Sequence, residues 1–302
     1  MNNNEQVYLD LLQDILDNGV KSDDRTGVGT LSVFGRQMRF DLTESFPLVT
    51  TKKVPWKGIT SELLWFIEGS GDERRLAELR YGKPREELED KNTIWTENAN
   101  APYWKNKAKY SGDLGRIYSH QWRKWLSVKD PRSALEYPNW SHHIKHLDQL
   151  AVLIESIKKD PYGRRHILTA WNPGELDYMA LPPCHMMSQF YVRNGELSCL
   201  MTQRSGDSFL GIPFNIASYS LLTMMIAQVC RLKPKEFILS LGDAHLYLNS
   251  LEAVEEQLKR NPLSPPTVVL NESITNIDDF TMDDITLVGY ESHPALKVAM
   301  AI

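Results

Sequence analysis

A cysteine that directly follows two prolines is the first feature of the sequence that could carry chemistry. Cys184 ends a Leu-Pro-Pro-Cys run, and the fixed φ angles of the prolines stiffen the backbone that holds its thiol. Such a thiol could act as a nucleophile if arginines from elsewhere lower its pKa, whereas His185 is expected to point to the other side of the next strand. A lone cysteine is more often a small buried apolar residue, a role that Cys199 and Cys230 fit better. Both roles stay open for Cys184.

A second set of polar residues lies between 203 and 215. Arg204 and Ser205 in a predicted turn offer donors to an anion, and Asn215 offers an amide near the first turn of an apolar helix. Taken alone, Asn215 would be an N-cap and Asp207 a turn former. The company of the other polar residues favours a binding site instead.

Further arginines stand at Arg25, Arg164 and Arg165 in a chain of acidic composition. The guanidinium fork matches a phosphate, so converging arginines would predict a monophosphate ligand. Solvated charged turns remain the alternative. Because adjacent residues at the start of a strand project to opposite faces, at most one of Arg164 and Arg165 should serve the pocket of its own subunit.

A carboxylate on an apolar helical face is the candidate for proton transfer. Glu62 shares such a face with Ile59 and Phe66, so it should be partly desolvated and its pKa raised. The alternative is a first-turn glutamate favoured by the helix dipole. The histidines His142, His143 and His146 cluster without an acidic or cysteine ligand, so we expect a solvent-facing helix start there and no metal.

Composition narrows the class of protein. The 302 residues include 34 Lys and Arg against 39 Asp and Glu, a net charge of -5, which disfavours non-specific nucleic-acid binding. The three cysteines form no CxxC spacing, which favours a reducing compartment over a disulfide framework or structural zinc site. Neither a secretory signal nor an apolar run of about 18 residues is apparent, so we expect a soluble cytoplasmic protein without membrane contact.

Apolar periodicity and turn signals predict the elements that must position these side chains. Helices are expected at 8–16 with a left-handed glycine cap, 58–67, 147–157, 216–229 and 248–259. Strands are expected at 29–40 with a break at Gly35, 166–171, 187–192, 197–203, 237–240 and 286–290. Asn194-Gly195 predicts a hairpin, and the charged segment 72–92 predicts a peripheral, solvated helical excursion. Hairpins mixed with long helices, and no linker, indicate one α+β domain over residues 1–302.

Nine segments in order along nearly the whole chain closely resemble the thymidylate synthase family. They are DRTGVGT (24–30), TTKK (50–53), ELLWF (62–66), DLGRIYSHQWR (113–123), GRRHILTAWNP (163–173), LPPCH (181–185), QRSGDSFLGIPFNIASY (203–219), GDAHLYLN (242–249) and HPALK (293–297). The resemblance implies a mixed, largely antiparallel sheet around a long buried helix, and a homodimer that packs through its sheets. Segments near 73–92 and 127–141 are variable insertions in the family.

The resemblance also implies roles for the nucleotide-binding residues. Cys184 would add to C6 of dUMP, Asn215 would pair with N3 and O4 of the uracil, and Glu62 and Tyr118 would handle protons. The phosphate would be bound by Arg25, Arg164, Arg165, Arg204 and Ser205, with the paired arginines supplied by the partner subunit. His245 and Tyr247 would hold the 3'-hydroxyl, and Asp207 would serve both substrates.

The second substrate implied is 5,10-methylenetetrahydrofolate, the donor of a one-carbon unit and then of hydride. The products would be dTMP and dihydrofolate. The folate would contact Ile94, Trp95, Leu181, Asp207, Gly211 and Phe214, and the tail 300–302, with Ala301, would close over it.

Two other functions compete with this one. A nucleotide hydroxymethylase of the same fold would let water capture the methylene intermediate, giving 5-hydroxymethyl-dUMP, and Asn215 disfavours only its cytosine-specific form. The family pattern is broken at Asn98, Ser250 and Ala299, and Asn98 and the tail lie where water must be excluded. A non-catalytic nucleotide- or RNA-binding homologue is the other alternative. The negative charge argues against RNA, and the full set of site residues argues against an inactive homologue.

Overall fold

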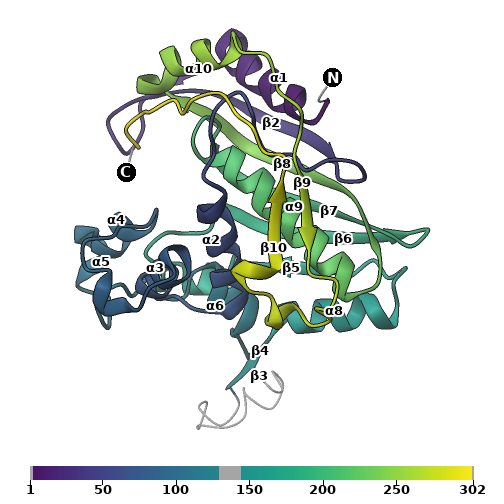
Figure 1. The fold of residues 1–302 in the computed structure, drawn as a ribbon. Coiled ribbons are helices and arrows are strands. Elements are labelled where there is room, and N and C mark those ends of the chain that lie inside the picture. Colours follow the sequence, from purple (N-terminus) through teal and green to yellow (C-terminus); the bar gives the residue numbers. More distant parts are fainter. Residues whose placement is uncertain (1–2, 129–143, 301–302) are drawn as a thin grey trace.

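A six-stranded sheet forms the centre of the computed structural model, which describes residues 3–128 and 144–300 (Figure 1). Within this sheet β7 and β8 pair in parallel and all other neighbours pair antiparallel, so the predicted mixed, largely antiparallel sheet is confirmed. In sheet order the strands are β1 (Val20–Ser22), β2 (Thr30–Asp41), β8 (Lys233–Tyr247), β7 (Glu196–Asp207), β6 (His185–Arg193) and β5 (Ile167–Thr169).

The long apolar helix α9 (Gly211–Val229) connects the two parallel strands and packs against both of them. It is the one helix of the described ranges whose length and hydropathy would suit a membrane span, but 78% of its apolar window is buried inside the fold. It also packs against α2 (Trp56–Glu68), which in turn contacts α6 (Tyr118–Arg123). Both α9 and α2 carry candidate site residues, so their packing fixes the site.

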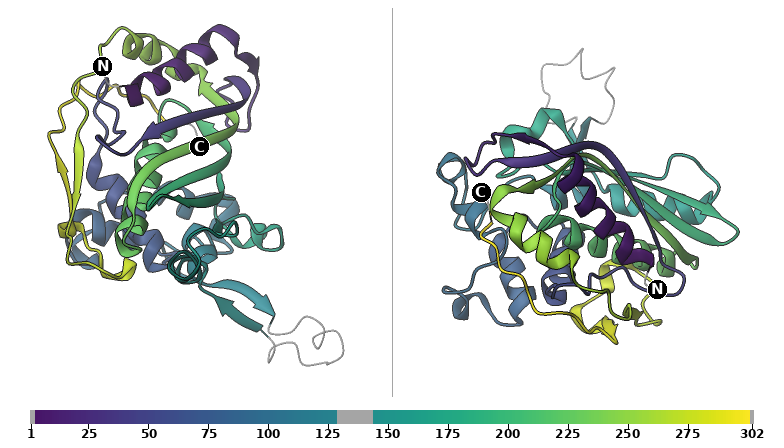
Figure 2. Two further views of the ribbon diagram at one scale, coloured as in Figure 1. Left: turned by 90° about the vertical axis from the view of Figure 1, so that its right-hand side faces the viewer. Right: turned by 90° about the horizontal axis from the view of Figure 1, so that it is seen from above.

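Helix α1 (Asn3–Asn18) lies across β2, beside α10 (Leu251–Leu258) (Figure 1). Tyr8, Leu12 and Ile15 are almost fully buried at helical spacing, which is why the apolar period predicted this helix. In β6 and β7 buried residues alternate with more exposed ones, because helices cover one face of the sheet while the other is open in this single chain (Figure 2).

The remaining helices and strands surround this core. They are α3 (Glu73–Tyr81), α4 (Thr96–Asn100), α5 (Pro102–Lys105), β3 (Trp125–Val128), β4 (Ile144–Leu147), α8 (Gln149–Lys159), β9 (Thr267–Leu270) and β10 (Ile285–Val288). Short 3-10 turns are η1 (Arg85–Glu87), η3 (Pro173–Tyr178), η4 (Leu248–Ser250), η5 (Ile277–Asp279) and η6 (Met282–Asp284).

Most of the predicted elements are present, with different ends. Asn194 and Gly195 both have positive φ, 53° and 76°, which confirms the predicted tight hairpin between β6 and β7. The predicted break at Gly35 is wrong: the residue has a φ of 73°, yet β2 continues through it in one register with β8. The predicted left-handed cap at Gly19 is also wrong. A Cβ there would lie 2.3 Å from the Ile15 carbonyl oxygen, so close approach explains this glycine.

The segment 72–92 is less peripheral than predicted. It forms α3 and η1, as its charge pattern suggested, but Leu76 and Ala77 are buried against the core. Its later residues Arg80 and Asn92 line a pocket with α2. The histidine prediction is corrected as well, because His146 lies exposed on strand β4 and not at a helix start, while His142 and His143 lie outside the described residues.

Candidate active site

Cys184 lies immediately before β6, where several groups hold both its backbone and its thiol. Its N–H donates to the Tyr118 hydroxyl oxygen at 2.6 Å, and its carbonyl accepts from the Arg204 N–H at 2.9 Å. Burial raises the pKa of the thiol, and the Arg204 guanidinium opposes that rise. The thiol is therefore held in place, as predicted. In the free protein, however, burial raises its pKa more than Arg204 lowers it.

The guanidinium of Arg204 is held by the proline turn itself. Its Nε donates to the Pro183 carbonyl at 2.9 Å and its Nη2 to the Pro182 carbonyl at 3.0 Å, which leaves Nη2 3.7 Å from Cys184 Sγ. Neighbouring strands β6 and β7 place the two residues side by side. The arginine thus serves as a fixed positive charge beside the sulfur.

Two aromatic residues, Tyr118 and Trp95, lie between Cys184 and Glu62. The Tyr118 ring lies 6.1 Å from the Trp95 ring, and Trp95 Nε1 donates to Glu62 Oε1 at 2.6 Å. Glu62 on α2 is half-buried, in line with the partial desolvation that its apolar neighbours predicted, and this desolvation raises its pKa to about 7. Such a carboxyl can both accept and release a proton near neutral pH.

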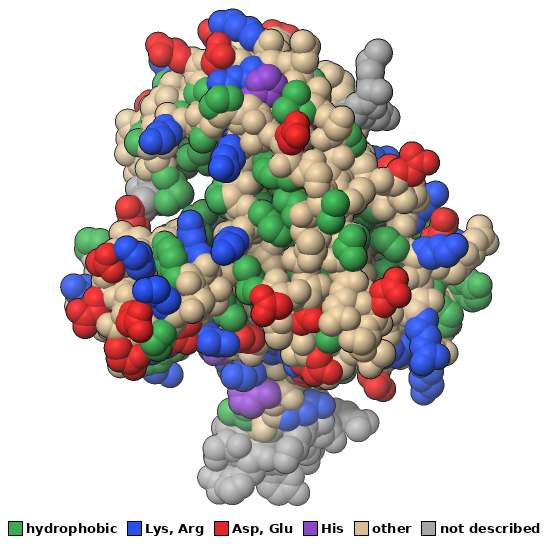
Figure 3. All heavy atoms as spheres, viewed as in Figure 1, with side chains coloured by type: hydrophobic (Ala, Val, Ile, Leu, Met, Phe, Trp, Pro, Cys, Tyr) green, Lys and Arg blue, Asp and Glu red, His purple; other side chains and the backbone are tan. Residues whose placement is uncertain are grey.

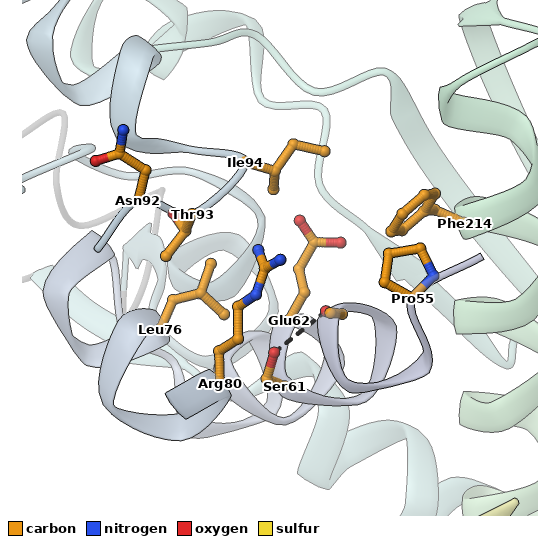
Figure 4. A pocket seen from close by; sticks show the side chains of 10 residues that line it. Pro55, Ser61, Glu62, Leu76, Arg80, Asn92, Thr93, Ile94 and Phe214 are labelled. Carbon is orange, nitrogen blue, oxygen red and sulfur yellow. Dashed lines mark hydrogen bonds between the residues drawn. The ribbon is translucent and has the colours of Figure 1, made fainter. Parts of the chain in front are cut away.

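Glu62 opens into a pocket of about 280 Å³ between α2, α3 and the start of α9 (Figure 4). In this view Phe214 and Pro55 lie on one side of the Glu62 carboxyl, Arg80 lies on the other, and Ile94 lies above it. Ile94 is 43% exposed although it is apolar, which suits a ligand that covers it. The space-filling view shows a hollow beside the lobe that carries α3 to α5, with basic side chains near its rim (Figure 3).

The Asn215 amide is oriented by its neighbours. Its Oδ1 accepts from Gln203 Nε2 at 3.1 Å, and its side chain also bonds to His185, which burial keeps neutral by lowering its pKa to about 4. The helix α9 begins at Gly211 with Leu210 before it, so Asn215 is not an N-cap. The amide is thus free of a capping role and is held as a recognition group would be.

Asp207 ends β7 and accepts from the N–H groups of Phe209 at 2.9 Å and Leu210 at 3.0 Å. It therefore forms the turn into α9, as one of its predicted roles required. Burial raises the pKa of Asp207.

Lys52 is a buried lysine close to Asp207. Its Nζ lies over the Phe209 ring, 3.3 Å from the ring centroid, and donates to the Phe209 carbonyl. Burial lowers the pKa of Lys52 to about 7, with Asp207 opposing.

The predicted sugar-binding residues follow on the adjacent strand. His245 pairs with Asp207 in the parallel register of β7 and β8, and its ring lies 5.2 Å from the Tyr247 ring. Arg25 is exposed in a turn that Asp24 holds by accepting from the Gly29 N–H, and its charge acts on the Tyr247 hydroxyl. His245 and Tyr247 thus lie at the end of β8, beside the end of β7 that carries Asp207.

Other predicted residues stand apart. Arg164 and Arg165 are exposed and make no hydrogen bond or ion pair with any residue of the described ranges. Ser205 lies on β7, Gly211 begins α9 and Leu181 packs partly buried against the core. Ala301 lies outside the described residues. No group of three potential metal ligands occurs in the part of the chain that the structure describes.

Sequence reasoning missed four residues of the site. Gln203 and His185 orient Asn215. The available signals were that Gln203 begins the polar run 203–207 and that His185 follows Cys184 directly. Lys52 gave none, because a lysine is seldom expected to be buried. Arg80 gave no signal either, because it lies in the segment 72–92, which was predicted to be peripheral and solvated.

The arrangement suits addition of a nucleophile to a polarised ring. A held thiol lies beside a fixed cation, a carboxyl with a pKa near neutrality is linked to it through two aromatic rings, and an oriented amide can read a base edge.

Comparison with known proteins identifies the family. A model of the family described as thymidylate synthase matches residues 6–302. The chain is also 48% identical over 301 residues to the bifunctional dihydrofolate reductase-thymidylate synthase of Zea mays, covering 99% of this chain and 54% of that protein. The chain thus spans about half the length of that relative. Together with the arrangement around Cys184, these matches establish that the chain belongs to the thymidylate synthase family.

Proposed function

We propose that the chain catalyses the reductive methylation of dUMP to dTMP, with 5,10-methylenetetrahydrofolate as the donor of the one-carbon unit and of hydride. Family membership supports a methyltransferase that acts on dUMP. The observation that carries the proposal is the placement of Cys184. Its Sγ lies 3.7 Å from Arg204 Nη2, and its backbone N–H donates to the Tyr118 hydroxyl oxygen.

In this reaction the Cys184 thiolate adds to C6 of the uracil, and the electron pair of the C5–C6 bond moves toward O4. Asn215, oriented by Gln203 and His185, pairs with N3 and O4 and so stabilises the charge that develops there. Arg25, Arg204 and Ser205 bind the phosphate, and His245 and Tyr247 bind the sugar. Of these residues, Arg204 and Ser205 lie on β7, and His245 and Tyr247 lie on the neighbouring strand β8.

The folate pocket is assigned to the cavity beside Glu62. C5 of the nucleotide attacks the one-carbon unit, loses its proton to the network of Glu62 and Tyr118, and expels tetrahydrofolate to leave an exocyclic methylene. Hydride from the same folate then forms the methyl group, and the Cys184 thiolate leaves, giving dTMP and dihydrofolate. The apolar side chains of Ile94 and Phe214, which line the cavity, would exclude water. Family membership adds Trp95, Leu181, Asp207 and Gly211 to the proposed folate contacts, together with Ala301, which lies outside the described residues.

A homodimer belongs to the same proposal. Arg164 and Arg165 are exposed and have no hydrogen-bond or ion-pair partner among the described residues, and the open sheet face carries exposed apolar side chains, with Phe34 at 82% and Tyr191 at 49% exposure. Pairing of two such faces would bury these side chains and carry the two arginines to the partner's phosphate site.

Product analysis tests the proposed reaction. The chain is incubated with dUMP and 5,10-methylenetetrahydrofolate, and we expect dTMP with one equivalent of dihydrofolate. Finding 5-hydroxymethyl-dUMP with tetrahydrofolate retained would instead establish the hydroxymethylase. Binding of dUMP with no folate-dependent release of tritium from C5 would establish a non-catalytic homologue.

The nucleophile is tested by substitution. We expect Cys184→Ser to lower kcat by about three orders of magnitude or more while dUMP still binds, since the hydroxyl is a far weaker nucleophile. Cys230→Ser, a half-buried cysteine away from the site, serves as the matched control and should keep near wild-type turnover. Unchanged turnover in Cys184→Ser would refute the mechanism.

A further inference from the structure

Arg80 differs from the other arginines of its segment. Arg74 pairs with Glu73, Arg75 with Glu68 and Glu78, and Arg85 with Asp72 and Glu78. All three guanidinium groups therefore have ion-pair partners, which are largely buried for Arg74 and partly exposed for Arg75 and Arg85.

Arg80 has no such partner among the described residues. It forms no ion pair within 4.0 Å and donates no hydrogen bond to them, and its one ring contact is with the partly exposed Tyr81 at 5.5 Å. Its place in the last turn of α3 suits the helix dipole, which is a structural reason for a basic residue there. That reason does not explain the direction of the side chain.

The side chain of Arg80 extends from α3 into the pocket, and its guanidinium lies on the same side as the Glu62 carboxyl (Figure 4). The group is half-buried, so solvent screens it less than a surface charge. Its positive charge favours the ionised form of Glu62 and opposes the effect of burial.

Few other groups act on this carboxyl. Trp95 donates a hydrogen bond and does not titrate, and Tyr219 on α9 is close enough for Glu62 to affect its hydroxyl. Burial holds the pKa of Tyr219 well above its usual value, so it is neutral at physiological pH. Within the described ranges, Arg80 is thus the cation that acts on Glu62.

We propose that Arg80 is a positioning residue that holds the Glu62 carboxyl partly ionised, and so sets the pH range over which Glu62 can accept a proton. The inference rests on the proposed function for its consequence in turnover, in which Glu62 receives the C5 proton. Its first part, the effect of one charge on another, is independent of any activity.

The test is a direct titration of Glu62 in the full chain. Difference infrared spectra follow the carboxyl C=O band against pH, with the Glu62→Gln spectrum subtracted. We expect Arg80→Gln and Arg80→Met to lower the acid dissociation constant of Glu62 by about three- to ten-fold, and Arg80→Lys to restore most of the wild-type value. Arg75→Gln removes one charge from the same helix away from Glu62 and should leave the titration unchanged.

Turnover gives the second readout. In Arg80→Gln, the limb of the kcat–pH profile that reports Glu62 should move to higher pH, and its apparent acid dissociation constant should fall by the same factor as in the titration. In Arg75→Gln this limb should stay in place. A wild-type titration in folded Arg80→Gln and Arg80→Met, judged by circular dichroism, would overturn the inference. A shifted titration in a chain that converts no dUMP would leave the inference standing and refute the proposed function instead.

Discussion

At the scale of single residues, the pKa values of Glu62 and Cys184 are set by burial, which favours the neutral forms, and by nearby donors and charges, which oppose it. Glu62 and Cys184 are both pushed toward their neutral forms by burial, whereas Trp95 and Arg204 favour the charged forms. In the free protein near neutral pH the thiol is therefore protonated, whereas the Glu62 carboxyl is only partly protonated. Ionisation of the thiol must be favoured when the nucleotide binds, because the thiolate is the attacking species.

Burial of Glu62 has a cost in stability whose sign can be derived. Its folded pKa of about 7 lies above the ordinary 4.5, so between these values the folded state holds a proton that the unfolded state has lost. The free energy of unfolding therefore falls as pH rises through this window, by up to about 3 kcal/mol for a shift of this size.

Substitution removes that dependence. We expect Glu62→Gln to be about as stable as wild type at pH 4.5 and more stable by about 1–3 kcal/mol at pH 8, measured by urea unfolding. Glu86→Gln, on the exposed turn η1, is the control and should have the same stability relative to wild type at pH 4.5 and at pH 8. If Glu62→Gln also differed from wild type by the same free energy at both pH values, the raised pKa of Glu62 would be contradicted.

The same residues show what the sequence could predict. The helical spacing of Ile59, Glu62 and Phe66 was enough to predict burial of the carboxyl, because period alone fixes the face of a helix. Its partners could not be predicted, because Trp95 and Arg80 reach it only after the segment 72–95 packs on α2. Contacts between segments distant in sequence carry no local signal.

At the scale of elements, the turn after β2 is held by the N-terminal helix. The Glu5 carboxylate on α1 accepts from the backbone N–H groups of Thr50 at 2.9 Å and Thr51 at 2.8 Å. The same turn accepts from Gln257 of α10 through the Thr51 hydroxyl at 2.8 Å. Two helices thus fix the turn that leads to the buried Lys52.

Loss of this anchor should be costly. Glu5→Ala leaves buried N–H groups without an acceptor, so we expect the free energy of unfolding to fall by about 2–4 kcal/mol. Asp10→Ala, whose carboxylate bonds only to Gln6 on the exposed face of the same helix among the described residues, should change it little. Similar losses in the two variants by urea unfolding would argue against the anchoring role.

Strand lengths were the least predictable feature of the elements. Only residues 237–240 of β8 were predicted, although the strand runs for 15 residues. The unpredicted part of the strand contains Lys233, Glu236 and Gly242, which weaken the apolar signal, and pairing with β7 and, from Glu236 onward, with β2 maintains the strand. Tertiary pairing overrides local propensity at these positions.

At the scale of the whole molecule, the proposed phosphate site needs arginines from a second chain. Arg25 and Arg204 belong to the side of the site near Tyr247 and Cys184, whereas Arg164 and Arg165 are exposed and unpartnered within the described residues. Substituting these two arginines should disturb the fold little, since surface charges contribute little to stability. Their proposed role can therefore be separated from folding.

Mixed dimers test that role. We expect Cys184→Ser and the double variant Arg164→Gln with Arg165→Gln each to be nearly inactive alone, because one lacks the nucleophile and the other the phosphate charges. Unfolded together and refolded at equal amounts, they should recover about a quarter of wild-type activity, since half of the randomly paired dimers hold one complete site of two. That site joins the intact Cys184 of one chain to the intact arginines of the other. Cys184→Ser refolded with Cys184→Ala is the control and should recover none, and a mixture no more active than its parents would show that the arginines act within their own chain or not at all.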